Sequence, residues 1–238
     1  MTIRINLWAS PRNVSTAMMY AWRQRPDTTV VDEPLYAHAL FQTGRDHPGR
    51  EDVLAAQDRD GERVVSEVIL GPAPTPIVFF KQMAKHLVAL DRGFLTRCRN
   101  VLLTRQPRDM LTSFQKQVPD ATLADTGLTE MVEILEATVA AGQEPIVLES
   151  RRLLTDPPLV LAELCHRLDV PYDDAMLSWP AGPKPEDGVW APYWYDAVHR
   201  STGWGPWRQK DDDLLPHLHP VLEEADELYE QLLRYAIS

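Results

Sequence analysis

The fold of this chain is decided by Leu7-Trp8-Ala9-Ser10-Pro11-Arg12-Asn13-Val14-Ser15-Thr16-Ala17-Met18. The apolar run at residues 3–8 has the composition of a β-strand, and residues 17–23 have that of a helix. A strand that runs directly into a helix leaves several backbone N–H groups pointing at one spot, and the positive end of the helix dipole adds to them. The turn between them therefore predicts a binding site for a phosphate or sulfate group.

Further strands and helices alternate along the rest of the chain. Apolar, β-branched runs lie at residues 28–31, 77–80, 101–103 and 146–148. Apolar residues at helical spacing lie at residues 18–23, 85–90, 109–118, 129–141, 158–168 and 214–235. This alternation predicts an α/β fold of three layers, in which a parallel sheet has helices on both faces.

Length and composition limit the possible classes of protein. The 238 residues, 44% hydrophobic and 25% charged, suit one soluble domain spanning residues 1–238. No apolar run approaches the roughly 18 residues of a membrane span, and the N-terminus lacks a signal-peptide pattern. The net charge of −11 argues against nucleic-acid binding. Cys98 and Cys165 are expected to be buried free thiols, as in a reducing cytoplasm.

Two segments interrupt the alternation of strands and helices. Residues 36–61 are polar and are expected to form an irregular insertion or lid. Residues 180–210 are rich in proline, glycine and tryptophan, and so long a loop within a compact domain is usually functional. Its aromatic rings have two interpretations: they line a ligand pocket, or they fasten the loop to the sheet. We expect fastening for most of them and a pocket role for one or two.

The first turn carries groups suited to an anion. Ser15 and Thr16 are expected to cap the helix and to offer hydroxyl donors, and the guanidinium of Arg12 matches phosphate or sulfonate oxygens. The alternative is a capped helix with a surface arginine. The chain lacks the glycines and lysine of the common phosphate loop, which weighs against ordinary ATP or GTP hydrolysis.

A second motif lies at residues 101–114. An apolar strand delivers Arg105 at its carboxyl end, where open α/β sheets bind ligands. Pro107 begins the next helix, and Ser113 lies one and a half turns into it. Arg105 and Ser113 are therefore able to reach one anion above the sheet. The alternative is that Arg105 pairs with an acidic neighbour.

Together the two motifs resemble those of the sulfotransferases that use 3′-phosphoadenosine 5′-phosphosulfate (PAPS). In many members the first loop reads P-R-S-G-S-T, and residues 11–16 occupy it here, with Asn13-Val14 in place of the smaller Ser-Gly pair. The second family signature, R-x-P-x-D followed by a serine, is matched by Arg105, Pro107, Asp109 and Ser113. The resemblance implies a P-loop type of fold with PAPS as co-substrate. It places the 5′-phosphosulfate on Arg12, Asn13, Val14, Ser15 and Thr16, and the 3′-phosphate on Arg105 and Ser113.

Later segments match the family in the same order. Residues 147–149 followed by Asp156-Pro157 look like a strand and helix start of the family. Residues 201–208 are similar to its C-terminal segment, which covers the nucleotide. By this resemblance Arg200 and Arg208 are additional phosphate ligands.

Glu33, at the end of the second predicted strand, is the candidate catalytic base. Several sulfotransferases place a catalytic glutamate after this strand in a similar Glu-Pro context. A carboxylate within hydrogen-bond reach can take the proton of an attacking hydroxyl, and positive groups such as Arg12 and Lys81 can stabilise the developing charge. Two alternatives stay open. In one, Glu33 caps a helix or pairs with Arg12; in the other, a one-residue error in strand phase makes Asp32 the base.

The histidines carry less information. His38 and His199 lie in the two irregular segments, where each either touches the acceptor or is simply exposed. His217 and His219 have the wrong spacing for a helical metal site and lack a third ligand. No metal is required if arginines and backbone amides neutralise the charge of the donor.

The predicted function is a cytoplasmic sulfotransferase that moves a sulfuryl group from PAPS to a small hydroxylated or amine acceptor. The two irregular segments are expected to build the acceptor side, and the oligomeric state stays open, with a homodimer among the possibilities. One alternative is a phosphotransferase or nucleotide hydrolase that holds Mg²⁺ on Thr16 and Asp32. Another is a non-catalytic module that binds a nucleotide or a partner. An aminotransferase is disfavoured because neither Lys81 nor Lys85 lies in an evident cofactor-lysine context.

Overall fold

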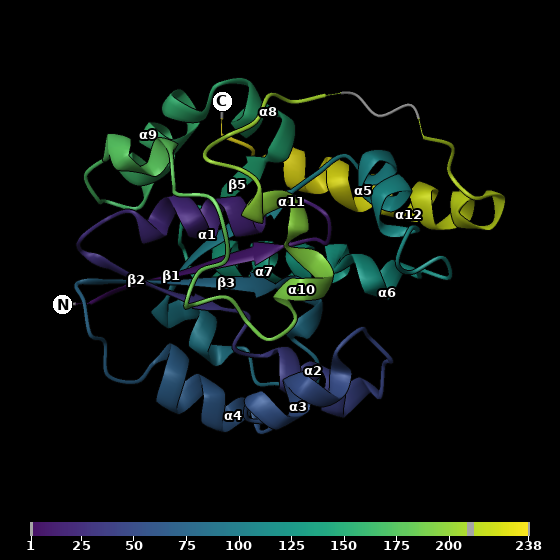
Figure 1. Ribbon diagram of the computed structural model, residues 1–238, viewed down its shortest axis with the longest axis horizontal. Helices are drawn as coiled ribbons and strands as arrows, with labels where there is room; N and C mark the ends of the chain where they lie inside the picture. The colour runs from purple at the N-terminus through teal and green to yellow at the C-terminus, as the bar shows by residue number, and fades with distance from the viewer. Residues whose placement is uncertain (1, 209–211, 238) are drawn as a thin grey trace.

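A five-stranded parallel sheet forms the middle of the molecule (Figure 1), in a computed structural model that describes residues 2–208 and 212–237. The strand order is β2-β3-β1-β4-β5, and every neighbouring pair is parallel. The strands are β1 (Ile3–Ala9), β2 (Thr28–Asp32), β3 (Ile77–Met83), β4 (Arg99–Thr104) and β5 (Ile146–Glu149). All five predicted strands are present, and β3 runs three residues beyond its predicted end.

Helices connect the strands and cover both faces of the sheet. The α-helices are α1 (Ser15–Arg23), α2 (Tyr36–Thr43), α3 (Arg50–Ala56), α4 (Gly61–Val64), α5 (Pro107–Phe114), α6 (Leu123–Thr126), α7 (Leu128–Ala140), α8 (Ser150–Thr155), α9 (Pro157–Arg167), α10 (Ala191–Trp194), α11 (Asp196–His199) and α12 (His219–Leu233). A π-helical turn lies at Val65–Ile69, and 3₁₀ turns lie at Ala84–His86, Gly93–Arg97, Asp174–Leu177 and Pro216–Leu218. The predicted α/β class is confirmed.

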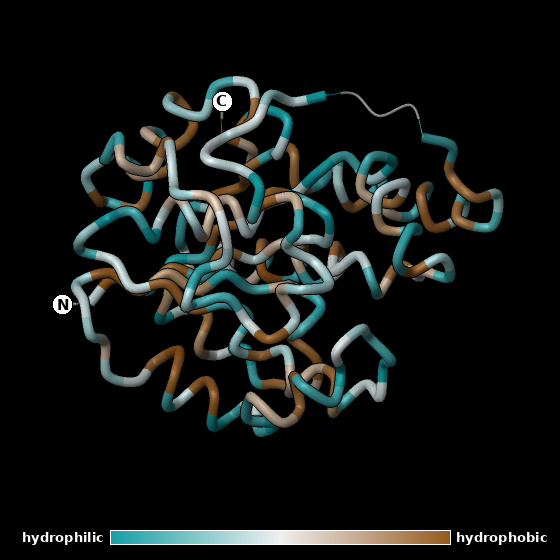
Figure 2. Tube along the Cα trace, in the orientation of Figure 1, coloured by the Kyte–Doolittle hydropathy of each residue, from teal (hydrophilic) through white to brown (hydrophobic). Residues whose placement is uncertain are grey.

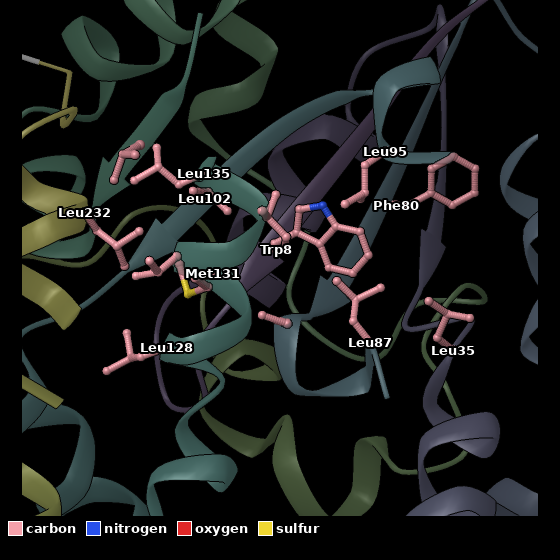
Figure 3. Packing of buried hydrophobic residues seen from close by; sticks show 14 of the residues in the cluster. Trp8, Leu35, Phe80, Leu87, Leu95, Leu102, Leu128, Met131, Leu135 and Leu232 are labelled. Atoms are coloured by element: carbon pink, nitrogen blue, oxygen red, sulfur yellow. The ribbon is translucent and has the colours of Figure 1, made fainter. Parts of the chain in front are cut away.

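Alternate residues of the strands supply two hydrophobic cores. On one face, Trp8 and Leu102 pack with residues of α7 and α12, including Met131 and Leu232 (Figure 3). On the other face, Leu7 and the neighbouring strands pack with α1 and α9. Hydrophobic stretches gather along the central strands and the helix segments against them, while the surrounding loops are mainly hydrophilic (Figure 2). Because both faces of the sheet are covered, each strand carries consecutive apolar residues.

The strand order creates a crevice at the carboxyl end of β1. The chain leaves β1 toward the edge strand β2, whereas it leaves β3 toward β4 on the other side of β1. Connections that diverge in this way open a space above the sheet, where α/β proteins bind ligands. The loops after β1, β2, β3 and β4 all begin at this edge.

Residues 36–61 differ from the predicted irregular lid. They contain α2 and α3 and lead into α4. Tyr36, Leu40 and Val53 are buried in a small third core that also includes Trp190 and Tyr195 from the later segment. The prediction of an irregular structure was wrong because these few apolar residues find partners far away in the sequence.

Three other helix predictions need correction. Residues 85–90 form only the 3₁₀ turn Ala84–His86, because Leu87 leaves the helical region (ψ 42°) and Ala89 further on is left-handed (φ 45°). The helix predicted over 109–118 is α5, which begins at Pro107 and ends at Phe114. The last helix begins at His219 rather than Leu214, since Pro216–Leu218 forms a 3₁₀ turn and Pro220 suits a first helical turn.

The long segment at residues 180–210 has short helical turns, α10 and α11, and its described part is otherwise irregular.

Cys98 and Cys165 are buried free thiols, as predicted. Within residues 2–208 and 212–237, the helices are all too short or too polar to cross a membrane.

Candidate active site

The loop between β1 and α1 takes its shape from Asn13. The Asn13 side chain accepts a hydrogen bond from the Ser15 backbone N–H (3.0 Å) and donates one to the Leu103 carbonyl oxygen of β4 (2.8 Å). Val14, the residue directly before α1, makes no side-chain hydrogen bond that would cap the helix. The prediction that Ser15 and Thr16 cap this helix was wrong, because Asn13 satisfies the exposed N–H instead. The Ser15 and Thr16 side chains line a cavity above the sheet.

The two predicted anion motifs are in direct contact. Arg105 donates a hydrogen bond from Nη1 to the Arg12 carbonyl oxygen (2.7 Å), and Arg12 Nε donates to Ser113 Oγ (3.3 Å). Arg105 also approaches the Asp109 carboxylate at 3.5 Å, so the acidic-neighbour alternative holds alongside the anion interpretation. Burial and the nearby Arg105 charge lower the pKa of Arg12. The two guanidinium groups repel each other, and an anion bound beside both would relieve that repulsion. The pair is therefore suited to bind an anion.

Two neighbouring cavities share this pair of motifs. The first, of about 340 Å³, is lined by Arg12, Arg105, Ser113 and Glu33, together with Lys81 and other groups. We call it the central cavity. The second, of about 900 Å³, shares Asn13, Val14 and Arg105 with the first and adds Arg151, Arg152, Trp207 and Arg208. We call it the outer cavity. The guanidinium of Arg151 lies 4.4 Å from the Trp207 ring centroid.

Glu33 and Asp32 point in different directions at the end of β2. Glu33 has a left-handed backbone (φ 38°), and its N–H donates to the Lys81 carbonyl oxygen (2.7 Å). The Glu33 side chain lines the central cavity and accepts a hydrogen bond from the Lys81 ammonium. Positive φ in a non-glycine residue is strained and often marks a functional position. The predicted alternative in which Glu33 pairs with Arg12 was wrong, since its ionic partner is Lys81.

Asp32 has its carboxylate oxygens occupied by other groups. The Tyr195 hydroxyl donates to Asp32 Oδ2 (2.8 Å), the Gly188 N–H donates to the same oxygen (3.1 Å), and Lys81 Nζ lies 3.2 Å from Oδ1. Asp32 does not line the central cavity. Neither Asp32 as base nor a magnesium site shared by Asp32 and Thr16 is supported by this arrangement. The described residues contain no cluster of three metal-ligating side chains.

Tyr195 joins these charged groups into one network. Its hydroxyl accepts hydrogen bonds from Lys81 Nζ (2.6 Å) and Trp190 Nε1 (3.0 Å) while it donates to Asp32. Burial alone would lower the pKa of Lys81, but Asp32 and Glu33 outweigh it and raise that pKa. Burial raises the pKa of Glu33, and Lys81 opposes the rise. A carboxyl group with a raised pKa is a better proton acceptor than an exposed one.

Three predicted residues lie away from the central cavity. His38 is buried, and its ring nitrogens contact the Val88 carbonyl oxygen (2.8 Å) and the Gly61 N–H (3.1 Å), so it supports local structure. His199 pairs with Asp187 at 2.9 Å. Arg200 is largely exposed and pairs with Asp196. Neither cavity is lined by any of the three, whereas Arg208 lines the outer cavity.

Sequence reasoning missed several residues of the central cavity. Tyr36, His47, Lys85, His86 and Tyr195 all line it. Lys85 and His86 are the second and third residues after β3, so their position at the carboxyl edge of the sheet was a usable signal. Tyr36 and His47 belong to residues 36–61, which we expected on the acceptor side, but nothing in the spacing of that segment singles out these two residues.

Aromatic residues of the later segment serve both predicted roles. Trp190, Trp194 and Trp204 line the central cavity, and Trp207 lines the outer one. Tyr195 fastens the segment to the sheet through Asp32, and Tyr20 of α1 donates a hydrogen bond to Asp187 (2.7 Å). More tryptophans line a cavity than we expected.

Comparison with known families agrees with this geometry. The sulfotransferase domain family matches residues 3–224. The chain therefore belongs to the sulfotransferase family, and the predicted family is confirmed.

Two curated relatives come from Arabidopsis thaliana. The chain is 38% identical over 227 residues to branched-chain-amino-acid aminotransferase-like protein 2, covering 94% of this chain and 40% of that protein. It is 43% identical over 200 residues to branched-chain-amino-acid aminotransferase-like protein 1, covering 84% of this chain and 36% of that protein. The chain thus spans well under half the length of these relatives.

Solved structures share the fold. The sulfotransferase domain from the curacin biosynthetic pathway aligns with a TM-score of 0.54 at 16% identity, covering 100% of this chain and 99% of that one. A sulfotransferase from Alicyclobacillus acidocaldarius aligns with a TM-score of 0.54 at 12% identity, covering 100% and 98% of the two chains. At these identities the likeness establishes the three-layer fold.

Proposed function

We propose that this protein transfers a sulfuryl group from PAPS to a small hydroxylated acceptor, with Glu33 as the base. The observation that carries the proposal is a single cavity lined at once by Arg12, Arg105, Ser113 and Glu33. A double arginine site suits the phosphate groups of the donor, and a buried carboxylate suits an attacking hydroxyl.

The donor has two anionic ends, and we assign each end to its own group of residues. The Arg12 side chain and the N–H groups that begin α1 favour the 5′-phosphosulfate, where the helix dipole adds to the attraction. Arg105 and Ser113 favour the 3′-phosphate. Arg208 lines the outer cavity, which shares Arg105, and is proposed as an additional phosphate ligand. For Arg200 the geometry gives no such support, because Arg200 pairs with Asp196 on the surface.

The proposed transfer is an in-line displacement at sulfur. The acceptor hydroxyl gives its proton to the Glu33 carboxylate, and its oxygen forms a bond to sulfur. The bond between sulfur and the bridging oxygen breaks, and its electron pair leaves with the 5′-phosphate of 3′,5′-adenosine bisphosphate (PAP). Arg12 and Lys81 stabilise the charge that develops on the oxygens around sulfur.

Binding of PAP tests the donor half of the proposal. We expect PAP to raise the melting temperature and to bind in titration calorimetry, and ATP with Mg²⁺ to bind much more weakly. Arg105→Ala removes charge-assisted hydrogen bonds and should weaken PAP binding about 10- to 100-fold. Arg200→Ala is the matched control and should leave PAP affinity unchanged. Tight binding of ATP with Mg²⁺ and no response to PAP would refute the proposal.

Turnover with PAPS tests the base. Glu33→Gln should lower kcat by about 10²- to 10⁴-fold, the usual contribution of a general base, with little change in PAP affinity. Glu186→Gln, a change of a partly exposed glutamate that pairs with Arg23, is the control. If Glu33→Gln turns over as fast as the wild type, Glu33 is not the base.

A further inference from the structure

One end of the central cavity is rich in hydrogen-bond donors that lack partners. Lys85 and His86 follow β3 and line this cavity beside Glu33, and Trp194 lines it from α10. His86 Nδ1 lies 3.9 Å from Glu33 Oε2, which is beyond hydrogen-bond distance. These three residues are separate from Arg12, Arg105 and Ser113, which form the proposed donor site.

His86 and Trp194 bury polar atoms without satisfying them. Only 2% of His86 is exposed, and neither ring nitrogen has a hydrogen-bond partner in the part of the chain that the structure describes. The indole Nε1 of Trp194 is also buried without a partner among those residues. Buried polar groups without partners are uncommon, because each loses its hydrogen bonds to water. A ligand in the cavity would supply the missing partners.

Lys85 adds a second positive charge to the cavity, whose carboxylate, Glu33, is already paired with Lys81. No described carboxylate lies within ion-pair distance of its ammonium, which approaches the Phe114 ring at 5.4 Å from the centroid. Asp125, Glu33 and Glu130 act on the charge of Lys85 from a distance, and Asp125 is already paired with Arg45. Burial lowers the pKa of Lys85, so an anion that neutralised its charge would be favoured.

Aromatic rings form the wall around these donors. The His86 ring stacks on Tyr36 with centroids 4.7 Å apart, and the Tyr36 hydroxyl is 2.9 Å from His47 Nδ1. The Trp190 ring meets Tyr36 edge to face at 5.1 Å. Burial and the charge of Lys85 lower the pKa of His47 to about 4, so His47 is neutral at pH 7 and adds no charge to that of Lys85. The wall favours a flat or compact molecule.

We infer that the acceptor is a small hydroxylated carboxylate whose carboxylate binds Lys85, Trp194 and His86 while its hydroxyl faces Glu33. This inference rests on the proposed function in assuming that the cavity holds the acceptor. Ammonium and indole N–H groups only donate hydrogen bonds, and an ionised carboxylate only accepts them. An amine acceptor would place a second positive charge beside Lys85, so the amine class is disfavoured.

Matched probes separate charge from shape. We would titrate 4-hydroxyphenylacetate, its amide and tyramine, and then 4-hydroxybutyrate and its amide, into the protein with and without saturating PAP. We expect each carboxylate to bind at least about tenfold more tightly than its amide, because a charge-assisted hydrogen bond is stronger than a neutral one. Tyramine should bind more weakly than the amide.

Variants locate the preference. Lys85→Met should remove the preference for carboxylate, Lys85→Arg should retain it, and Trp194→Phe should reduce it while it keeps an aromatic ring. Lys116→Met, which changes an exposed lysine outside both cavities, should leave it intact. All of these variants should bind PAP like the wild type, which also shows that they are folded.

The outcomes distinguish this inference from the proposed function. Failure of the wild type to bind PAP overturns the donor assignment, while the titrations without PAP still decide the carboxylate preference. Equal affinity for carboxylate and amide, a preference that survives Lys85→Met, or no carboxylate binding at about 10 mM overturns the inference, whatever PAP does.

Discussion

The Tyr195 hydroxyl offers a direct test of whether the later segment holds the proposed base in place. Tyr195→Phe removes one oxygen atom and keeps the ring. That oxygen contacts three buried groups: Lys81, Trp190 and Asp32. The ring of Tyr195, at 4% exposed, stays packed in the small third core.

The expected loss follows from these three hydrogen bonds. Two of them involve charged groups, for which about 1.5–3 kcal/mol each is typical, and the third is neutral and contributes about 1 kcal/mol. Simple addition gives about 4–7 kcal/mol. The true loss should be smaller, about 3 kcal/mol, because Lys81 keeps Glu33 and Asp32 keeps the Gly188 N–H, while Trp190 loses its hydrogen bond.

Denaturant unfolding measures the change. A loss of about 3 kcal/mol corresponds to a fall in Tm of about 6–12 °C for a domain of this size. Tyr193→Phe is the control, since Tyr193 lies two residues earlier and is 49% exposed. We also expect Tyr195→Phe to lower kcat with PAP affinity unchanged, because Lys81, which holds Glu33, loses a fixed neighbour. Stability within about 0.5 kcal/mol of the wild type, as expected for Tyr193→Phe, would refute the network.

Three other predictions concern separate parts of the molecule. Asn13→Ala should lower the free energy of unfolding by about 1 kcal/mol in denaturant titration and weaken PAP binding, because α1 loses its cap; no change in either would contradict this role. Burial raises the pKa of Glu33 above its ordinary 4.5, and a base must be ionised to accept a proton. We therefore expect kcat/KM to fall as the pH is lowered through that raised pKa. A pH profile whose acid limb lies at or below 4.5 would count against Glu33 as the base. Burial raises the pKa of Cys98 and Cys165 to about 11 each, so iodoacetamide at about pH 8 should label both slowly in the folded protein and quickly in urea, and fast labelling of the folded protein would contradict their burial.

The strands could be predicted because their signal is local. Both faces of the sheet are covered, so each strand is a short apolar run that stands out from the polar connections. The same search for an apolar run placed the end of the third strand at residue 80, three residues before the end of β3. Lys81 is polar and interrupts the run, yet it lies in the strand, 2% exposed, because two carboxylates neutralise its charge. Composition does not reveal a charged residue that is buried through partners from other segments.

The donor half of the site was more predictable than the acceptor half. Arg105 and Ser113 belong to a strand and helix with clear patterns, and their contact with the first loop follows from the strand order. Tyr195 and Tyr36 come from segments without periodicity. They reach the cavity because both segments pack together in the small third core. Such packing depends on the tertiary fold, so no local spacing predicts it.

Asn13 changes the interpretation of the first loop. A glycine in such a loop lets the backbone turn toward an anion, and Asn13-Val14 lacks that freedom. Here Arg12 adopts the left-handed conformation (φ 57°), and the Arg105 guanidinium binds the carbonyl oxygen of that same residue. The Asn13 side chain fixes the next residues of the loop, because it donates to the Leu103 carbonyl oxygen and accepts from the Ser15 N–H. The loop is therefore fixed by side chains in a shape that glycine makes accessible elsewhere, and the Asn13-Val14 pair is consistent with a preformed anion site rather than with its loss.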